Sequence, residues 1–581
     1  MKITLIYPPS DCLNCECFNL PNLSLPVLAG HLRGLGHEVR MADLDDPFHR
    51  AIRPANPGVN FAVLAHPDKT SAFLKGRLKG PEAALLTRIA GLLAGAPELK
   101  EKTELYGLTL AGFKMNAFLL NAVGLIAWRL KKLNPAAKTV VGYSGVSREV
   151  YHGLLEKYPS LDFAVYSGGG PHLARLADYV RKGPDSGGLL STLERRGRKI
   201  IDHAARMPDE LSRPDYAGYP LEGYKVSAEQ LLARYSPDVP FKADLLKRAG
   251  PGKQLVLMYR FETTCRGRCA FCGNDGRSPA APPDAAQVVE DLERMKALGA
   301  TGVYFINPNF NNRYAFADEL CDRMIKRRLG LLWSDCVNFR ELDEPLLRKM
   351  RAAGAVKLTF GMETGSPRLL RYIRKGVLPP KIEALLKISH DLGIWNHIEL
   401  IGGLPTETEA ELQETVAFLR RNSAHIDTYS INPFFLYPSS PFCREPEKFG
   451  LRLRRAGEGS RPDPLSAVEA PGNFSERFDE IGGLTFEQKD AQIRRSTRIL
   501  GETVKELATL RAIDFEHIHL LMFLYSAFGH GKKELIRRIA TLLTMRFMPY
   551  NLDKFLSAVD FRKHEYDRVL KEKPAAGKRA R

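Results

Sequence analysis

The chain has 581 residues, of which 44% are hydrophobic and 26% are charged, and this composition is ordinary for a soluble globular protein of several domains. Its 85 Lys and Arg residues outnumber its 67 Asp and Glu residues, and the formal net charge of +18 favours anionic partners or only keeps the protein soluble. The longest apolar stretch, Ala117 to Trp128, is shorter than the roughly 20 residues that span a bilayer, so we expect a buried helix and no membrane span.

The first part of the chain alternates apolar runs with helical patterns. Lys2 to Tyr7 is a β-rich run that ends at two prolines, and a helical pattern follows from Leu25 to Leu35. Further strands are predicted at Glu38 to Met41, Lys138 to Gly142 and Asp162 to Tyr166. This alternation predicts an α/β domain with a doubly wound parallel sheet over residues 1–185. The next stretch, residues 186–250, is rich in Gly, Pro and Tyr and is predicted to be a linker.

A second alternating series begins with a strand at Leu255 to Phe261. The helix after it begins at Asp284, and Gln287 three residues later completes an acidic version of a capping box. Five more strands are predicted at Val303 to Ile306, Leu331 to Cys336, Val356 to Met362, His397 to Ile401 and Asp427 to Ile431. Six β/α repeats predict a partial (β/α)6 TIM-type barrel over residues 251–445. Residues 446–581 are predicted to form a helical C-terminal domain, whose helices could cover the barrel mouth.

The nine cysteines are not spaced like a disulfide framework. Six of them lie in two tight clusters, Cys12, Cys15 and Cys17 in the first and Cys265, Cys269 and Cys272 in the second. Close clusters in a large chain without an export signal indicate metal sites in a reducing compartment, so we expect a cytoplasmic protein. The first cluster could hold a metal, approach the upper face of a cofactor, or consist of reduced loop cysteines with no ligand.

The second cluster carries the sharpest signal, Cys265-Arg-Gly-Arg-Cys269-Ala-Phe-Cys272, in the loop after the first barrel strand. A 4Fe–4S cluster is normally held by cysteine thiolates, and three of them leave one iron open. That iron can chelate the amino and carboxylate groups of S-adenosylmethionine (SAM). A structural zinc site would need four ligands in two pairs, and no second pair lies nearby.

This spacing is the signature of the radical SAM superfamily, and Phe271 before the last cysteine is similar too. The resemblance continues at the segment from Phe360 to Ser366 and at the segment from Ile401 to Thr408. It implies a cluster on the three cysteines and SAM contacts at Glu363, Gly402 and Pro405. The strand-two motif of the family usually bears Asp where this chain has Asn307, so the charge of that SAM contact is missing here. Lys375-Gly376 matches a similar pair of the family.

A radical SAM barrel after a doubly wound domain resembles the cobalamin-binding subgroup of this superfamily. The matching stretches are residues 1–45 and 138–182. The resemblance implies cobalamin contacts in three turns of the sheet, at Pro8, Gly142, Tyr143, Ser144, Ser167, Gly168 and Gly169. The subgroup motif that places a histidine below the cobalt is absent, so we expect cobalamin without a protein histidine ligand. The alternative is a domain that kept its fold and lost the cofactor.

The resemblance implies a radical SAM enzyme that cleaves SAM reductively and starts radical chemistry. The most specific expectation is cobalamin-dependent methylation of an unactivated carbon, or a rearrangement, in secondary metabolism. The expected partners are a small-molecule or peptide substrate and a flavodoxin- or ferredoxin-type electron donor, and nucleic acid is not expected.

Two other functions stay open at this point. A tRNA methylthiotransferase also joins an α/β domain bearing three cysteines to this barrel, and the basic charge would suit RNA. Those cysteines are normally dispersed, whereas Cys12, Cys15 and Cys17 are crowded, and no small all-β module is evident at the C-terminus. A cofactor sensor with a decayed barrel is the non-catalytic alternative, and the intact cysteines and Glu363 argue against it.

Overall fold

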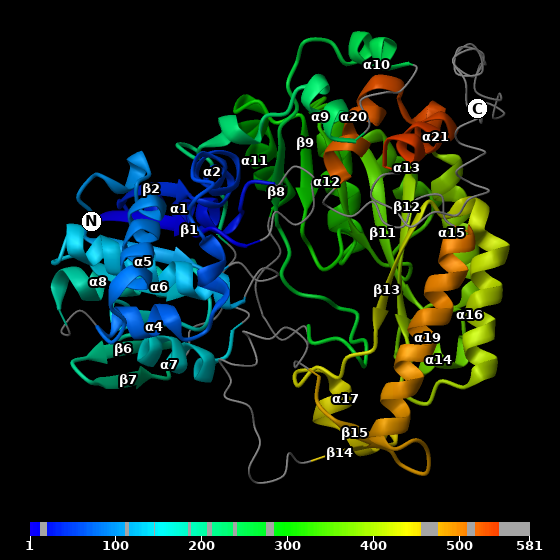
Figure 1. The fold of residues 1–581 in the computed structure, drawn as a ribbon. Coiled ribbons are helices and arrows are strands. Elements are labelled where there is room, and N and C mark those ends of the chain that lie inside the picture. Colours follow the sequence, from blue (N-terminus) through cyan, green and yellow to red (C-terminus); the bar gives the residue numbers. More distant parts are fainter. Residues whose placement is uncertain are drawn as a thin grey trace.

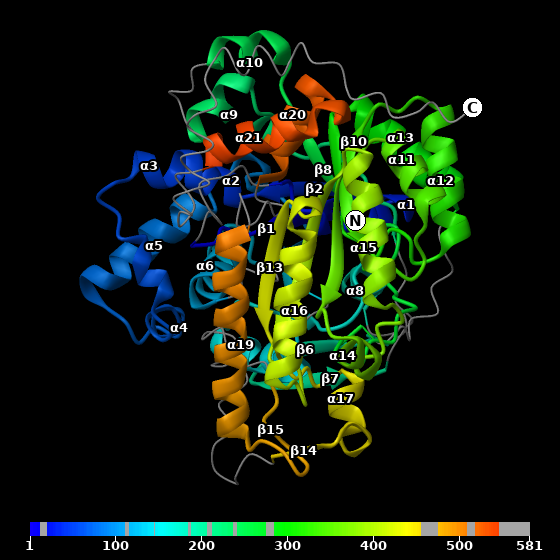
Figure 2. The ribbon, with the colours of Figure 1, turned by 90° about the vertical axis from the view of Figure 1, so that its right-hand side faces the viewer.

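The computed structural model describes residues 1–11, 20–110, 116–143, 146–183, 188–205, 212–235, 241–274, 284–454, 475–507 and 517–544. Three of the expectations above therefore lie outside the described residues, namely those on Ser144, on the cysteines at 12, 15 and 17, and on the end of the C-terminal domain. Figure 1 shows the N-terminal domain and the barrel side by side, and Figure 2 shows the barrel in front.

The N-terminal domain is built on a seven-stranded sheet in the order β2-β1-β3-β4-β5-β6-β7. Its strands are β1 (Lys2–Tyr7), β2 (Glu38–Asp43), β3 (Leu105–Thr109), β4 (Lys138–Gly142), β5 (Phe163–Val165), β6 (Thr192–Arg196) and β7 (Lys199–His203). The first five in this order are parallel, which confirms the predicted fold class, and β6 and β7 add an antiparallel edge. Because β6 and β7 follow residue 185, the sheet extends into the stretch expected to be a linker.

Helices cover both faces of this sheet because the strands alternate apolar side chains to both sides. Ile3 and Leu5 of β1 pack in one apolar core with α1, whereas Ile6 packs in the other with α6. The helices of the domain are α1 (Ser24–Gly34), α2 (Asp45–Pro47), α3 (Arg53–Ala55), α4 (Lys69–Leu74), α5 (Gly80–Leu93), α6 (Ala117–Leu133), α7 (Arg148–Lys157) and α8 (Gly170–Lys182). The apolar stretch at 117–128 is the buried core of α6, as predicted. In the part of the chain that the model describes, no helix has the length and apolarity needed to cross a membrane.

The barrel is an open sheet of six parallel strands in the order β13-β12-β11-β10-β9-β8. The strands are β8 (Val256–Tyr259), β9 (Gly302–Phe305), β10 (Leu332–Val337), β11 (Ala355–Glu363), β12 (Trp395–Gly402) and β13 (Thr428–Pro433). The helices between them are α11 (Ala285–Ala297), α12 (Tyr314–Lys326), α13 (Glu344–Ala352), α14 (Pro367–Tyr372), α15 (Pro379–Asp391) and α16 (Glu409–Asn422). The six β/α repeats of the partial barrel are confirmed.

The remaining elements lie at the side of the barrel and at both of its ends (Figures 1 and 2). They are α9 (Ala228–Tyr235), α10 (Lys242–Ala249), α17 (Pro441–Arg444), β14 (Leu451–Leu453), β15 (Phe478–Glu480), α19 (Phe486–Leu507), α20 (Ile518–Phe528) and α21 (Lys533–Thr544). Helix α19 lies along β13 and α16 at the open side of the sheet (Figure 2). Helix α20 shares an apolar core with Val256, Val356 and Trp395, which begin their strands or lie near the start. Helix α20 therefore covers the N-terminal ends of the strands. Helix α19 runs along the side and also contacts the turn after β12, at the end of the barrel where the cysteine loop lies.

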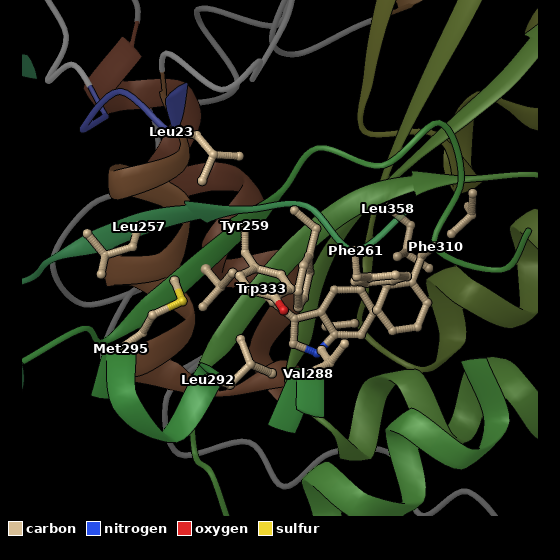
Figure 3. Packing of buried hydrophobic residues seen from close by; sticks show 14 of the residues in the cluster. Leu23, Leu257, Tyr259, Phe261, Val288, Leu292, Met295, Phe310, Trp333 and Leu358 are labelled. Carbon is tan, nitrogen blue, oxygen red and sulfur yellow. The ribbon is translucent and has the colours of Figure 1, made fainter. Parts of the chain in front are cut away.

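An aromatic cluster fixes the segment that follows β9. Phe310 stacks on Trp333 of β10 with ring centroids 4.5 Å apart and meets Phe261 and Phe305 edge to face (Figure 3). All four side chains are buried. Aromatic pairs of this geometry add to the free energy of burial, so the backbone on either side of Phe310 is held in place.

Candidate active site at the C-terminal ends of the barrel strands

The cysteine loop leaves the C-terminal end of β8, and its three thiols are half-buried. A Cβ atom added at Gly267 would lie 3.1 Å from Cys265 Sγ and 3.6 Å from Cys269 Sγ. The two sulfurs therefore border one small space that the glycine leaves free. The loop is pinned at Ala270, whose N–H donates to the carbonyl of Ile373 and whose carbonyl accepts from Phe442, both at 2.9 Å.

Burial raises the pKa of the Cys269 thiol to about 11, although the charge of Lys375 acts in the opposite direction. Burial also raises the pKa of the Cys272 thiol. Binding a metal would therefore release protons from the loop. Among the residues that the model describes, no group of three or more Cys, His, Asp or Glu side chains has the spacing for a single metal ion.

Glu363 lies at the end of β11 and forms a buried ion pair with Lys375, whose Nζ donates to Glu363 Oε1 at 2.7 Å. A Cβ atom at Gly361 would lie 2.8 Å from Glu363 Oε1 and 2.9 Å from Lys375 Nζ, so this glycine makes room for the pair. Burial alone would lower the pKa of Lys375, but Glu363 and Cys269 raise it overall. Glu363 thus fixes the ammonium group of Lys375 within electrostatic reach of Cys269 in the cysteine loop.

The backbone at Glu363 is unusual for a residue with a side chain. Its φ of +70° lies in the left-handed region, and the register between β11 and β12 shifts between Gly361 and Glu363. A conformation of this kind costs about 1–3 kcal/mol and persists where the surrounding structure holds it. Bulges at strand ends redirect side chains, and this one aims the carboxylate of Glu363 toward Lys375.

Asn307 is buried at the end of β9, and both the oxygen and the nitrogen of its side-chain amide form hydrogen bonds within the protein. Its Oδ1 accepts the N–H groups of Phe261 and Glu262, each at 2.9 Å, and its Nδ2 donates to Asp335 at 2.6 Å. Burial raises the pKa of Asp335 to about 8. Asn307 therefore braces the backbone that leads into the cysteine loop, and its expected contact with SAM stays a prediction.

Gly402 lies at the end of β12 and Gly403 follows it, and both face helix α19. A Cβ atom at Gly402 would lie 2.8 Å from Thr497 Cα, and one at Gly403 would lie 2.5 Å from Ile493 Cα. The two glycines allow this close approach of the helix, which is a structural role. Pro405 is buried in the turn that follows. The adenine contacts expected at Gly402 and Pro405 also stay predictions.

The three turns expected to contact cobalamin end parallel strands, so they lie on one edge of the N-terminal sheet. Figure 1 shows this edge directed toward the barrel. Pro8 is buried, whereas Gly142, Tyr143, Ser167 and Gly168 are partly exposed and Gly169 is exposed. The turns expected to contact cobalamin thus share the edge of the N-terminal sheet that is directed toward the barrel.

Several polar residues around the site were not singled out from the sequence. They are Glu262, Asn309 and Asn312 beside the cysteine loop, and Asp43, Tyr219 and Tyr224 between the N-terminal domain and the barrel. The signal for the first group was available, because four asparagines within six residues follow β9 directly. The tyrosines lie in the segment expected to be an extended linker.

Comparisons with known proteins agree with this geometry. Residues 259–419 match the model of the radical SAM superfamily, so the predicted resemblance is confirmed. The chain is 22% identical over 280 residues to an uncharacterised methyltransferase of Pyrococcus horikoshii, with 46% of this chain and 54% of the relative covered. It is 26% identical over 301 residues to an anaerobic magnesium-protoporphyrin IX monomethyl ester cyclase of Rubrivivax gelatinosus, with 50% of each covered. The chain thus spans about half the length of the curated relatives it matches.

Two solved structures share the fold over most of the chain. One is TsrM from Kitasatospora setae, a radical SAM methyltransferase with cobalamin and a 4Fe–4S cluster bound, at a TM-score of 0.57 and 17% identity over 93% of this chain and 99% of that one. The other is OxsB, a cobalamin-dependent SAM radical enzyme, at a TM-score of 0.54 and 14% identity over 97% of this chain and 75% of that one. At these identities the likeness establishes the fold.

Proposed function

We propose that this chain, which belongs to the radical SAM superfamily through residues 259–419, cleaves SAM reductively at a 4Fe–4S cluster held by Cys265, Cys269 and Cys272. The observation that carries the proposal is the cysteine loop at the C-terminal end of the first barrel strand, with the Glu363–Lys375 ion pair beside it. Barrel enzymes place their chemistry at this end of the strands. The three thiols are the donor set of such a cluster, and Gly267 leaves the sulfurs of Cys265 and Cys269 free of a side chain between them.

When bound, the cluster would supply the electron that breaks a carbon–sulfur bond of SAM, and cobalamin would supply the carrier for a methyl group. The residues of the chain bind the cluster and SAM and orient them. Cys265, Cys269 and Cys272 would hold the cluster through three thiolates, and the iron without a protein ligand would be available to SAM. Glu363 offers carboxylate oxygens to the ribose hydroxyls or the ammonium group of SAM. Lys375 holds that carboxylate in place and balances the negative charge of the thiolates.

We further propose that the N-terminal domain binds cobalamin between its C-terminal sheet edge and the barrel. The fold shared with TsrM and OxsB supports this, as do the partly exposed turns at Gly142, Tyr143 and Ser167. The lower face of the cobalt would have no protein histidine, because His172, the nearest one in sequence to these turns, is only 1% exposed and lies in α8.

The reaction we favour is methylation of an unactivated carbon, with a rearrangement as the alternative outcome. The substrate would be a small molecule or a peptide, and a flavodoxin- or ferredoxin-type protein would deliver the electron. Closely spaced cysteines that serve as a metal site suit a reducing compartment, so we propose a cytoplasmic location.

The first experiment is anaerobic reconstitution with iron and sulfide, followed by a visible spectrum and an assay for 5′-deoxyadenosine with a strong reductant. Cys269→Ala should abolish both signals. Cys321→Ala is the matched control, because Cys321 is a buried thiol of α12 outside the loop and should keep both. Wild-type protein that binds no iron and forms no 5′-deoxyadenosine would refute the proposal.

The second experiment tests cobalamin separately. The protein is incubated with hydroxocobalamin, gel-filtered and examined by its visible spectrum, and the one-electron-reduced cobalt form is then examined by electron paramagnetic resonance. We expect retained cobalamin without nitrogen superhyperfine splitting. A nitrogen splitting would contradict the histidine-free site, and loss of all cobalamin on gel filtration would contradict the cofactor.

A further inference from the structure

The segment after β9, residues 307–312, carries four asparagines, and three of them bond to the cysteine loop or to the chain that leads into it. Its central residue, Phe310, is 1% exposed and stacks on Trp333, and its N–H donates to the carbonyl of Cys336 at 2.8 Å. The segment is therefore anchored from both the backbone and the side chain. Asparagines next to such an anchor hold their amides in fixed positions, because the backbone that carries them cannot shift.

Three of the four asparagines bond to backbone groups. Asn307 accepts from the N–H groups of residues 261 and 262, as described above. Asn312 accepts from the N–H of Arg266 at 2.9 Å and donates to the carbonyl of Thr264 at 3.1 Å. Asn311 donates to carbonyls of the loop after β10. Asn307 and Asn312 thus fix the path of the chain on both sides of the first cysteine.

Asn309 differs from the other three asparagines because its side-chain amide forms a hydrogen bond with a sulfur. Its Nδ2 lies 3.2 Å from Cys265 Sγ and donates to it. Cys265 Sγ also accepts the backbone N–H of Gly267 at 3.3 Å, and Cys272 Sγ accepts that of Asn274 at 3.4 Å. The two backbone donors belong to the loop itself, whereas the Asn309 amide reaches the sulfur from the segment that follows the neighbouring strand β9.

A hydrogen bond to a ligand sulfur acts on the redox equilibrium of a cluster. The reduced cluster carries one more negative charge, which spreads over the sulfurs, so a donor stabilises the reduced form more than the oxidised form. Hydrogen bonds to the sulfurs are among the factors that set the reduction potential of iron–sulfur clusters. A donor that is fixed by packing acts more strongly than a mobile one, because no ordering cost is paid on reduction.

We infer that Asn309 is a redox-tuning residue, whose side-chain amide donates to the cluster ligand Cys265 and makes the cluster easier to reduce. This inference rests on the cluster of the proposed function. Asn309 acts through Cys265, whose sulfur accepts its amide, and is therefore a positioning residue. Its effect should therefore appear in the potential of the cluster before it appears in any activity.

The test is a redox titration of the reconstituted full-length protein, in which electron paramagnetic resonance follows the reduced cluster. Asn309→Ala should lower the ratio of reduced to oxidised cluster about tenfold at a fixed potential, which is about 59 mV for a one-electron couple. Asn309→Asp keeps the size of the side chain, replaces the donor with a negative charge, and should lower the ratio further.

Asn274→Ala is the matched control. It removes the side-chain bond from Asn274 Nδ2 to the carbonyl of Thr263, at 3.3 Å, but keeps the backbone N–H that donates to Cys272. Its potential should equal that of the wild type. Equal potentials in Asn309→Ala, Asn309→Asp and wild type would overturn the inference. Loss of iron in both Asn309 variants, with iron retained in wild type and in Asn274→Ala, would also overturn the inference. The residue would then hold the cluster rather than tune its potential. Wild-type protein that assembles no cluster would refute the proposed function itself.

Discussion

Substituting Gly402 with alanine should displace helix α19 from the edge of the barrel. The added Cβ would lie 2.6 Å from Thr497 Oγ1, 2.7 Å from Thr497 N and 2.8 Å from Thr497 Cα. Carbon atoms in contact are normally separated by 3.5–4.0 Å, so the methyl group overlaps the helix by about 1 Å. Two of these three atoms belong to the helix backbone, which cannot rotate out of the way. Overpacking of this kind costs about 1–3 kcal/mol.

The assay is hydrogen exchange of the backbone amides in α19. If the cost falls on the docking of the helix, its opening free energy decreases by the same amount, and protection of residues 486–507 decreases roughly 5- to 150-fold. Gly501→Ala, in the same helix, is the matched control, because a Cβ at this position meets nothing within 4 Å. It should leave protection unchanged or increase it, since alanine favours a helix over glycine by up to about 1 kcal/mol.

The same experiment separates the two roles considered for Gly402. If this glycine exists for adenine alone, Gly402→Ala weakens SAM binding and leaves α19 as well protected as in the wild type. Unchanged protection in α19 would therefore refute the argument from packing. Weaker SAM binding together with lower protection would show that the helix shapes this side of the site.

Cys265→Ala, Cys269→Ala and Cys272→Ala should each remove the cluster, measured as iron content and 5′-deoxyadenosine formation, and full iron in any one of them would contradict the assignment. Glu363→Gln should keep the cluster but raise the Kd for SAM roughly 10- to 150-fold by calorimetry, because a charge-assisted hydrogen bond contributes about 1.5–3 kcal/mol; an unchanged Kd would remove the residue from the site. Burial raises the pKa of Asp43 from 3.8 to about 6, so the folded protein binds a proton at Asp43 more tightly than the unfolded protein does. The stability that this proton contributes is full below about pH 4 and is lost as the pH rises through 6. The difference in unfolding free energy between wild type and Asp43→Asn should thus shift by about 2.4 kcal/mol in favour of the wild type from pH 7 to pH 4, and a difference that is flat with pH would contradict it.

Asp43 contacts the segment that connects the two domains. Asp43 ends β2 and is 4% exposed, and its Oδ2 accepts the hydroxyls of Tyr219, at 2.5 Å, and of Tyr224. Both tyrosines lie between the N-terminal sheet and the barrel. Protonation of Asp43 therefore removes the negative charge from a buried contact with the segment that joins the two domains.

The barrel and the cysteine loop could be predicted from the sequence because their signals are local. Each barrel strand is a short apolar run between turn residues, and three cysteines within eight residues must meet in one loop wherever that loop lies. Glu363 and Lys375 were likewise marked by the motifs around them. Pattern reasoning succeeds here because neighbours in the chain are neighbours in space.

Tertiary structure alone decided the features that join distant residues. The hairpin β6–β7 was expected to be linker, because its charged strands lack a clear apolar alternation and are stabilised by pairing with β5. The approach of α19 to Gly402 joins residues about 95 positions apart, and the bond from Asn309 to Cys265 joins residues 44 positions apart. The sequence around a glycine or an asparagine does not indicate which distant residue it will contact. Its role is set only when packing brings a helix or a sulfur to within contact distance, and that depends on the whole fold.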